Sequence, residues 1–102
     1  MTKIKICGIR MPLDIEYVNE LRPEYVGFVF AKSKRKVDLK NAHKLINNLN
    51  EGIKKVGVFV DEDPSVVIKI AKGLQLEVLQ FHGHETQEYI DQFRSNEIWK
   101  EI

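Results

Sequence analysis

The sequence contains a single cysteine, three prolines and one tryptophan, and neither sign of charge prevails. One cysteine cannot form a disulfide within the chain. Sixteen lysine and arginine residues against fifteen aspartate and glutamate residues leave no basic excess that would attract nucleic acid or an anionic membrane. The sequence has no apolar run long enough to cross a membrane or to act as a secretory signal. We therefore expect a thiol-reduced, cytoplasmic protein without nucleic-acid or membrane partners.

Length limits the number of domains. A chain of 102 residues can bury one core of modest size and is too short for two independent domains. The sequence also lacks a serine-rich or proline-rich segment that would act as a linker. We expect residues 1–102 to form a single domain.

Five short segments are expected to form β-strands. Residues 3–7 alternate between isoleucine and other side chains, which is the period-two pattern of a strand. The runs at 25–30 and 56–60 are rich in valine and phenylalanine, as in strands covered on both faces. Residues 76–81 form a fourth candidate strand and residues 97–102 a fifth.

Between these segments the apolar period changes to that of helices. Apolar residues at three- and four-residue steps predict helices over 39–49 and 67–74, with Asp38 capping the first and Asp63 introducing the second. Shorter stripes at 15–21 and 89–93 predict two more helices. Strands that alternate with helices imply a parallel sheet joined by right-handed crossovers.

The only cysteine stands where the first strand ends. In parallel α/β architectures, ligands bind at the carboxyl ends of the strands. Lys5 lies two residues before Cys7 and thus on the same face of the strand. A nearby ammonium group favours the thiolate, which makes Cys7 a candidate base or nucleophile. The alternative is that Cys7 is a small buried hydrophobic residue.

The second strand is followed by four cations within residues 32–36. Such a run is commonly a solvated loop, but its place at the end of a strand also suits an anion site. Arg35 is the candidate ligand in that case. A guanidinium group holds a carboxylate through two parallel hydrogen bonds, which a lysine cannot do.

Polar residues also gather at the end of the fourth strand, over residues 80–85. Gln80 and His82 share one face there, and we expect them to form hydrogen bonds with a ligand. A metal site is not expected, because the chain has no second cysteine and no HExxH spacing. The acidic residues 61–63 are interpreted as the entry to the helix that begins at Pro64, rather than as catalytic acids.

Four motifs occur together in a fixed order: KICGI at 5–9, VGFVF followed by KSKR within 26–35, VGVFV at 56–60 and QFHGHE at 80–85. The set resembles the phosphoribosylanthranilate isomerases of tryptophan biosynthesis. The resemblance implies a TIM (βα)8-barrel and N-(5′-phosphoribosyl)anthranilate as the substrate. It also implies an Amadori rearrangement to 1-(2-carboxyphenylamino)-1-deoxyribulose 5-phosphate, with no metal or organic cofactor.

The resemblance also implies roles for individual residues. Cys7 is expected to be the general base that removes the proton from C2′ of the ring-opened Schiff base. Arg35 is expected to hold the anthranilate carboxylate, while His82 and Gln80 line the site. The further expectation that Lys5 tunes Cys7 comes from its position and not from the family.

The length of the chain departs from the family pattern, because a complete barrel needs about 200 or more residues. The family's ring-opening acid, an aspartate on the sixth strand, and its phosphate-binding segments have no counterpart within 102 residues. We therefore expect an incomplete barrel of about five parallel strands and four helices, from a fragment or a truncated gene product. We expect little or no isomerase activity from this chain alone, and a homo-oligomer formed through its open sheet edges.

Other interpretations remain open. About 100 residues with five parallel strands also suit a small flavodoxin-like or receiver-like binding domain. A receiver needs an acidic cluster at the end of its first strand, where this sequence reads Cys7-Gly8-Ile9-Arg10. A non-catalytic homo-oligomeric half-barrel and another phosphosugar barrel enzyme are the remaining alternatives.

Overall fold

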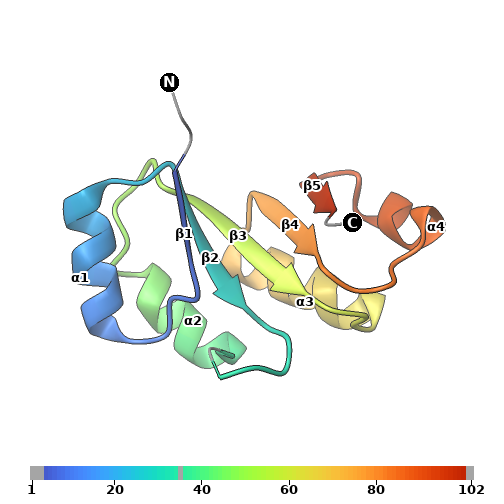
Figure 1. Ribbon diagram of the computed structural model, residues 1–102, viewed down its shortest axis with the longest axis horizontal. Coiled ribbons are helices and arrows are strands. Elements are labelled where there is room, and N and C mark those ends of the chain that lie inside the picture. Colours follow the sequence, from blue (N-terminus) through green and yellow to red (C-terminus); the bar gives the residue numbers. More distant parts are fainter. Residues whose placement is uncertain (1–3, 35, 101–102) are drawn as a thin grey trace.

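A computed structural model shows one parallel sheet with helices between successive strands (Figure 1). The structure describes residues 4–34 and 36–100. The strands are β1 (Lys5–Cys7), β2 (Tyr25–Val29), β3 (Lys54–Phe59), β4 (Val78–Phe81) and β5 (Glu97–Lys100). The helices are α1 (Pro12–Leu21), α2 (Leu39–Ile46), α3 (Pro64–Leu74) and α4 (Gln87–Ile90), and a 3-10 turn (Asp91–Phe93) continues α4.

The spatial order of the strands is their order in the sequence. The sheet runs β1-β2-β3-β4-β5, and each neighbouring pair is parallel. A flavodoxin-like sheet instead places its first strand between the second and the third. The observed order contradicts the flavodoxin-like interpretation and confirms the expected incomplete barrel of βα units. β1 and β5 lie at the two edges of the sheet (Figure 1).

Several elements are shorter than the sequence pattern predicts. The expected helix over 39–49 ends at Ile46, and residues 47–49 form a tight turn. The amides of Asn48 and Leu49 donate there to carbonyls only three residues back, at 3.1 and 3.0 Å. The fourth strand begins at Val78 rather than at residue 76, because the Leu76 amide donates to Ala71 at the end of α3. Residue 3 of the expected first strand and residues 101–102 of the fifth lie outside the described residues.

The expected helix caps are confirmed for α2 and α3. The Asp38 carboxylate accepts a hydrogen bond from the Asn41 amide at 2.7 Å. The Asp63 carboxylate accepts from the Ser65 amide at 3.0 Å, and the Ser65 hydroxyl donates to it as well. These hydrogen bonds from Ser65, the backbone one first, lower the pKa of Asp63 below its usual value. Both helices thus begin where short-range sequence signals place them.

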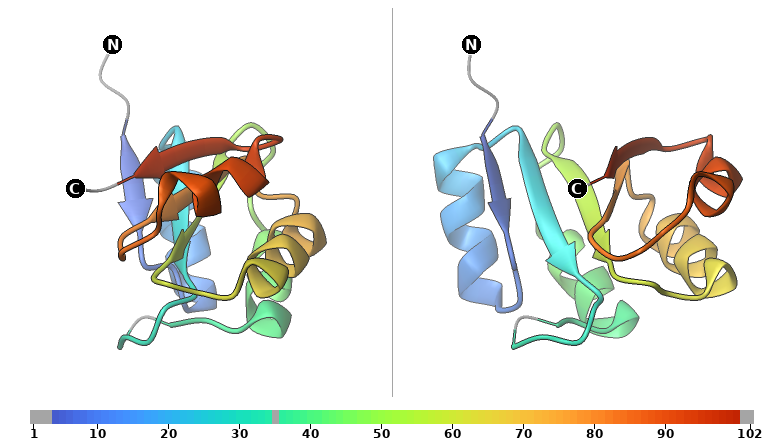
Figure 2. Two further views of the ribbon diagram at one scale, coloured as in Figure 1. Left: turned by 90° about the vertical axis from the view of Figure 1, so that its right-hand side faces the viewer. Right: turned by 45° about the vertical axis from the view of Figure 1, so that its right-hand side comes forward.

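The helices pack along one face of the curved sheet (Figure 2). Alternate strand residues, among them Phe28, Phe59 and Phe81, point to this face and form the main core with the helices. We call the other face, to which the remaining strand residues point, the inner face. It holds a small cluster of Tyr25, Val56 and Val78 with Trp99 packed against it.

Candidate active site

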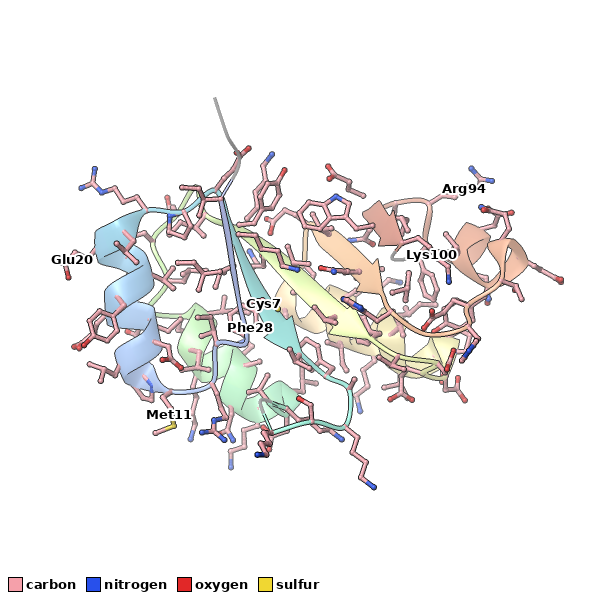
Figure 3. All side chains as sticks on the ribbon, viewed as in Figure 1. Cys7, Met11, Glu20, Phe28, Arg94 and Lys100 are labelled. Carbon is pink, nitrogen blue, oxygen red and sulfur yellow. The ribbon has the colours of Figure 1, made fainter. Side chains whose placement is uncertain are left out.

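Cys7 ends β1 on the inner face, and its side chain is exposed. Figure 3 labels Cys7 near the end of β1. The chain turns directly after Cys7 because Gly8 has a φ of 88°, a conformation that other residues rarely adopt. The amides of Gly8 and Ile9 both donate to the carbonyl of Gly27, at 2.9 and 3.2 Å. This turn holds the sulfur at the carboxyl end of the sheet, so the alternative of a buried structural cysteine is wrong.

Gly27 of β2 makes room for the two side chains that β1 sends to the inner face. It pairs with Cys7 in the sheet. A Cβ atom at position 27 would lie 2.9 Å from Sγ of Cys7 and 3.2 Å from Cε of Lys5. The first distance is shorter than side chains tolerate, so the present arrangement needs a glycine. The same distances confirm that Lys5 and Cys7 share one face.

A chain of polar side chains crosses the inner face from β1 to β4. Nζ of Lys5 donates a hydrogen bond to Oε1 of Gln80. Nε2 of Gln80 lies 2.8 Å from Nε2 of His82. Gln80 is buried, whereas His82 is exposed just beyond the end of β4. Nζ of Lys5 also lies 5.6 Å from the centre of the Trp99 ring. We call Lys5, Gln80 and His82 the inner-face network.

A second polar cluster braces the loop that follows β4. The buried Glu85 carboxylate accepts hydrogen bonds from the amides of Asp61 and Gly83, at 2.6 and 2.9 Å. Nζ of Lys100 in β5 donates to the Glu85 carbonyl at 2.8 Å. The His84 amide donates to Oδ1 of Asp61 at 2.6 Å. These contacts tie the carboxyl ends of β3, β4 and β5 together beside His82.

The bracing role of Glu85 and Lys100 was not expected from the sequence, and the expectation for Asp61 is wrong. Asp61 does not introduce α3. It has a φ of 48° and accepts a hydrogen bond from His84 across the loop. One sequence signal for this packing is Gly83, because a Cβ atom there would lie 2.5 Å from Oδ1 of Asp61. A glycine between two histidines thus marks a close approach of two loops.

Tyr89 of α4 covers the outer side of the same loops. Its hydroxyl donates to the carbonyl of Glu62, and its ring meets that of Phe81 edge-on, with centroids 5.5 Å apart. Burial raises the pKa of Tyr89 to about 12, and the nearby carboxylates, Glu85 first, add to the rise. The phenol therefore stays protonated and remains a donor near neutral pH.

Arg35 lies outside the described residues, but the loop on either side of it is anchored. Nη1 of Arg10 donates to the carbonyl of Lys34 at 2.9 Å. Lys36 forms an isolated parallel bridge with Val29, the last residue of β2. Both contacts hold this basic loop at the carboxyl end of the sheet.

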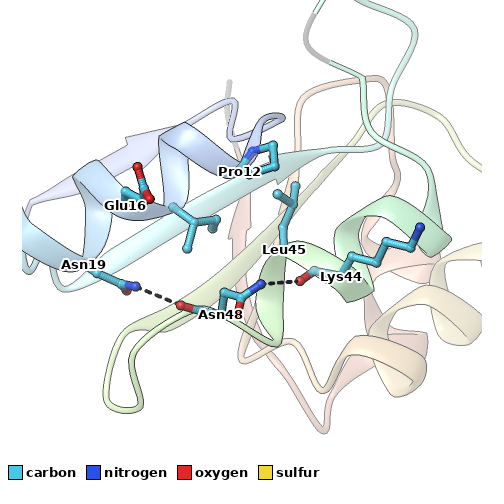
Figure 4. Close-up of a pocket in the computed structure, with 7 residues that line it drawn as sticks. Pro12, Glu16, Asn19, Lys44, Leu45 and Asn48 are labelled. Atoms are coloured by element: carbon cyan, nitrogen blue, oxygen red, sulfur yellow. Dashed lines mark hydrogen bonds between the residues drawn. The ribbon is translucent and has the colours of Figure 1, made fainter.

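A groove between α1 and α2 lies apart from the strand ends (Figure 4). It is lined by Pro12, Glu16 and Asn19 of α1 and by Lys44, Leu45 and Asn48 of the α2 side. A hydrogen bond from Asn19 to the Asn48 carbonyl at 2.8 Å links its two walls, and one from Asn48 to the Lys44 carbonyl at 3.4 Å lies within the α2 side. These residues belong to the helical layer and not to the candidate active site.

Residues 4–34 and 36–100 contain neither a candidate metal site nor a membrane-spanning helix. Within these ranges, groups of three or more His, Cys, Asp and Glu side chains placed to hold a metal ion are absent. The helices of this part of the chain are also too short or too polar to span a membrane.

Comparison with known proteins decides the family. The family model described as N-(5′-phosphoribosyl)anthranilate (PRA) isomerase matches residues 4–102. The chain belongs to the N-(5′-phosphoribosyl)anthranilate isomerase family. A relative with that name from Caldanaerobacter subterraneus subsp. tengcongensis is 58% identical over 102 residues, which are 100% of this chain and 50% of the relative. A relative of the same name from Clostridium acetobutylicum is 52% identical over the same length and share.

Solved phosphoribosylanthranilate isomerases have the same fold. The Thermotoga maritima structure gives a TM-score of 0.91 at 34% identity and covers 98% of this chain and 50% of its own. A structure in complex with reduced 1-(o-carboxyphenylamino)-1-deoxyribulose 5-phosphate gives 0.92 at 34% identity, with 98% and 53% covered. The chain thus spans about half the length of the isomerases that it matches, and the resemblance and barrel-type fold expected from the motifs are confirmed.

Three of the candidate site residues expected from the sequence lie at the carboxyl ends of the strands. Cys7 lies at the carboxyl end of β1, and Gln80 and His82 lie at that of β4, on the same inner face. The structure brings Lys5, Gln80 and His82 into contact, which the sequence pattern alone did not indicate.

Proposed function

We propose that this chain supplies the base-bearing side of an active site for the Amadori rearrangement of N-(5′-phosphoribosyl)anthranilate. The observation that carries the proposal is the exposed Cys7 at the strand ends of a chain that belongs to the isomerase family. In the ring-opened Schiff base, the Cys7 thiolate removes the proton from C2′. The C2′–H electrons form a C1′–C2′ double bond, and the iminium electrons move to nitrogen. Tautomerisation of the resulting enol-amine yields the ketone.

The proposal assigns the neighbouring residues to binding. Arg35 holds the anthranilate carboxylate through its two parallel donors, while Gln80 and His82 line the site. The binding partner is therefore a small phosphosugar-anthranilate molecule, and the reaction uses neither metal nor organic cofactor. A cytoplasmic location belongs to the same proposal, because it is where a biosynthetic reaction on a phosphorylated metabolite is expected.

The chain alone is proposed to have little or no activity. It spans about half the length of its relatives, and the proposal places the ring-opening acid and the phosphate site on barrel segments beyond those matched here. Loss of a positioned general acid lowers rates by about 10²- to 10⁴-fold. Without ring opening, Cys7 has no acidified C2′ proton to remove.

The test uses loss of phosphoribosylanthranilate fluorescence with two proteins. One is the purified 102-residue chain. The other is a fusion of this chain to the part of the Caldanaerobacter relative that follows the matched region. We expect turnover by the fusion only, and a fall of at least about 10²-fold on Cys7→Ala. An undiminished rate in that variant contradicts the role of Cys7.

Two further outcomes test the inactivity of the chain alone and the alternative of a non-catalytic half-barrel. Turnover by the 102-residue chain that disappears on Cys7→Ala contradicts the proposal that the chain alone is inactive. A well-folded fusion without turnover favours the non-catalytic half-barrel.

We also propose that the 102-residue chain self-associates, with a second copy as its partner. β1 and β5 are the edge strands of the sheet, and edge strands are common places for pairing with another chain. Leu13, Tyr17 and Leu21 form an apolar stripe along α1 and are 56%, 57% and 68% exposed. Light scattering at micromolar concentration tests this, with Tyr17→Lys expected to weaken the association. A strictly monomeric mass contradicts it.

A further inference from the structure

The inner-face network has a direction that its donor and acceptor chemistry imposes. A lysine ammonium group has donors only. Lys5 must therefore face the carbonyl oxygen of the Gln80 amide, which is the observed contact. The NH₂ group of that amide then faces Nε2 of His82, at 2.8 Å. Because an amide NH₂ only donates, Nε2 of His82 must accept and carries no proton.

We infer that Lys5 and Gln80 are positioning residues that select, for the neutral imidazole of His82, the tautomer with its proton on Nδ1. The order of donors runs from the Lys5 ammonium to the Gln80 oxygen, and from the Gln80 NH₂ group to Nε2 of His82. The usual ambiguity between the oxygen and nitrogen of a glutamine amide does not arise here, because the lysine decides it.

The surroundings hold each member of the network in place. Gln80 is only 5% exposed, in the middle of the paired part of β4. The Lys5 stem lies in the space left by Gly27, and its ammonium group lies over the Trp99 ring. The backbone amide of His82 donates to the Phe59 carbonyl at 3.0 Å, which fixes the point from which the ring extends. Only the imidazole itself reaches the exposed end of the sheet.

In this tautomer the imidazole carries its proton as an N–H donor on Nδ1, while Nε2 is the acceptor. Its remaining proton, on Nδ1, suits an oxygen of a bound carboxylate, sugar or phosphate group. For the rearrangement, which rests on the proposed function, His82 binds a substrate oxygen and leaves proton removal to Cys7. The described hydrogen bond of Lys5 goes to Gln80, so in this inference Lys5 acts on the site through His82, a role distinct from the expected tuning of Cys7.

Nuclear magnetic resonance of the imidazole nitrogens and Cδ2 carbons distinguishes the two tautomers directly. We would record these signals for the purified 102-residue protein at a pH where the imidazole is neutral. His43 and His84 give their own signals and serve as internal references. We expect His82 to show the Nδ1–H pattern. An Nε2–H pattern in the unmodified protein overturns the inference, whatever the variants do.

The variants test the direction of the network. Gln80→Glu replaces the donor beside His82 with an acceptor, so we expect the tautomer to reverse to Nε2–H. Lys5→Met removes the donor that faces the Gln80 oxygen, and a mixture of tautomers is expected. Lys5→Arg keeps a donor and is expected to retain Nδ1–H. An unchanged tautomer in both Gln80→Glu and Lys5→Met contradicts the inference.

Lys54→Met is the matched control. Lys54 also points to the inner face and places Nζ 5.6 Å from an aromatic ring, that of Tyr25. It is not part of the inner-face network, so the His82 signals are expected to stay unchanged. The readout needs no substrate. The tautomer of His82 can therefore be confirmed even if Cys7 is not the base. Equally, Cys7 can be the base even if the tautomer inference is wrong.

Discussion

The two faces of the sheet are built from alternate residues of the same strands, yet they serve different purposes. On the helix-covered face, Phe28, Phe59 and Phe81 are almost completely buried. On the inner face, a polar network and an exposed cysteine lie beside a cluster of only three buried residues. The difference indicates that the covered face supplies most of the stability, while the inner face supplies the geometry of the reactive groups.

Strand register couples the two faces. Because side chains alternate, burying Phe28 under the helices obliges Gly27 and Val29 to face inward. Gly27 in turn is what admits the side chains of Lys5 and Cys7. The core therefore sets the position of the candidate site through the backbone, although the two sets of side chains point in opposite directions.

The largest expected effect is loss of stability from the covered face. Phe28→Ala removes a fully buried ring and is expected to lower the free energy of unfolding by about 3–5 kcal/mol. Val29→Ala, its partly exposed neighbour on the inner face, is expected to cost less than about 2 kcal/mol. Urea unfolding followed by circular dichroism measures both. Equal losses contradict the division of roles between the faces.

The next largest effect is expected from the polar cluster around Glu85, which holds the loop after β4. Glu85→Gln keeps the shape of the side chain but places an NH₂ group where the buried carboxylate accepts from the Asp61 and Gly83 amides. We expect a loss of about 1.5–3 kcal/mol, the range for hydrogen bonds to a charged group. Faster hydrogen exchange at these two amides is the specific readout. Lys100→Met is expected to have a smaller effect, since that side chain is partly exposed.

Gly27→Ala is expected to change the position of the Cys7 side chain more than it changes the free energy of unfolding. The new methyl group meets Sγ of Cys7, but the Cys7 and Lys5 side chains can move outward, so the cost is expected at the low end of about 1–3 kcal/mol. The rate of Cys7 alkylation by iodoacetamide is expected to change several-fold, because the methyl group displaces the sulfur from its present position. Gly73→Ala is the control. Its Cβ would lie 3.6 Å from Leu39, an ordinary contact, and an unchanged alkylation rate is expected.

The smallest expected effect is on the pH dependence of the free energy of unfolding. The folded protein raises the pKa of Tyr89 from 10.0 to about 12, so folding favours the neutral phenol. This contribution to stability is fully present below pH 10 and is lost as the pH rises from 10 to about 12. The urea midpoints of wild type and Tyr89→Phe are expected to converge over that range. A constant difference between pH 9 and 11.5 contradicts the assignment.

Local features of this protein were determined by the sequence alone. The strand and helix periods, the caps at Asp38 and Asp63, and the shared face of Lys5 and Cys7 all follow from side chains within a few residues of one another. The four motifs, at 5–9, within 26–35, at 56–60 and at 80–85, together indicated the family, which the comparisons confirm. Such patterns are visible in a sequence because helix and strand geometry repeat over short distances.

Contacts across the inner face and between loops were decided only by the tertiary structure. Lys5 and Gln80 are separated by 75 positions, and they meet because the curved sheet brings β1 and β4 together across its inner face. Glu85 meets Asp61 and Lys100 because three parallel strands end side by side. Strand alternation predicts the face to which a side chain points. The partner that it finds there depends on the curvature and order of the whole sheet, which no short stretch of sequence encodes.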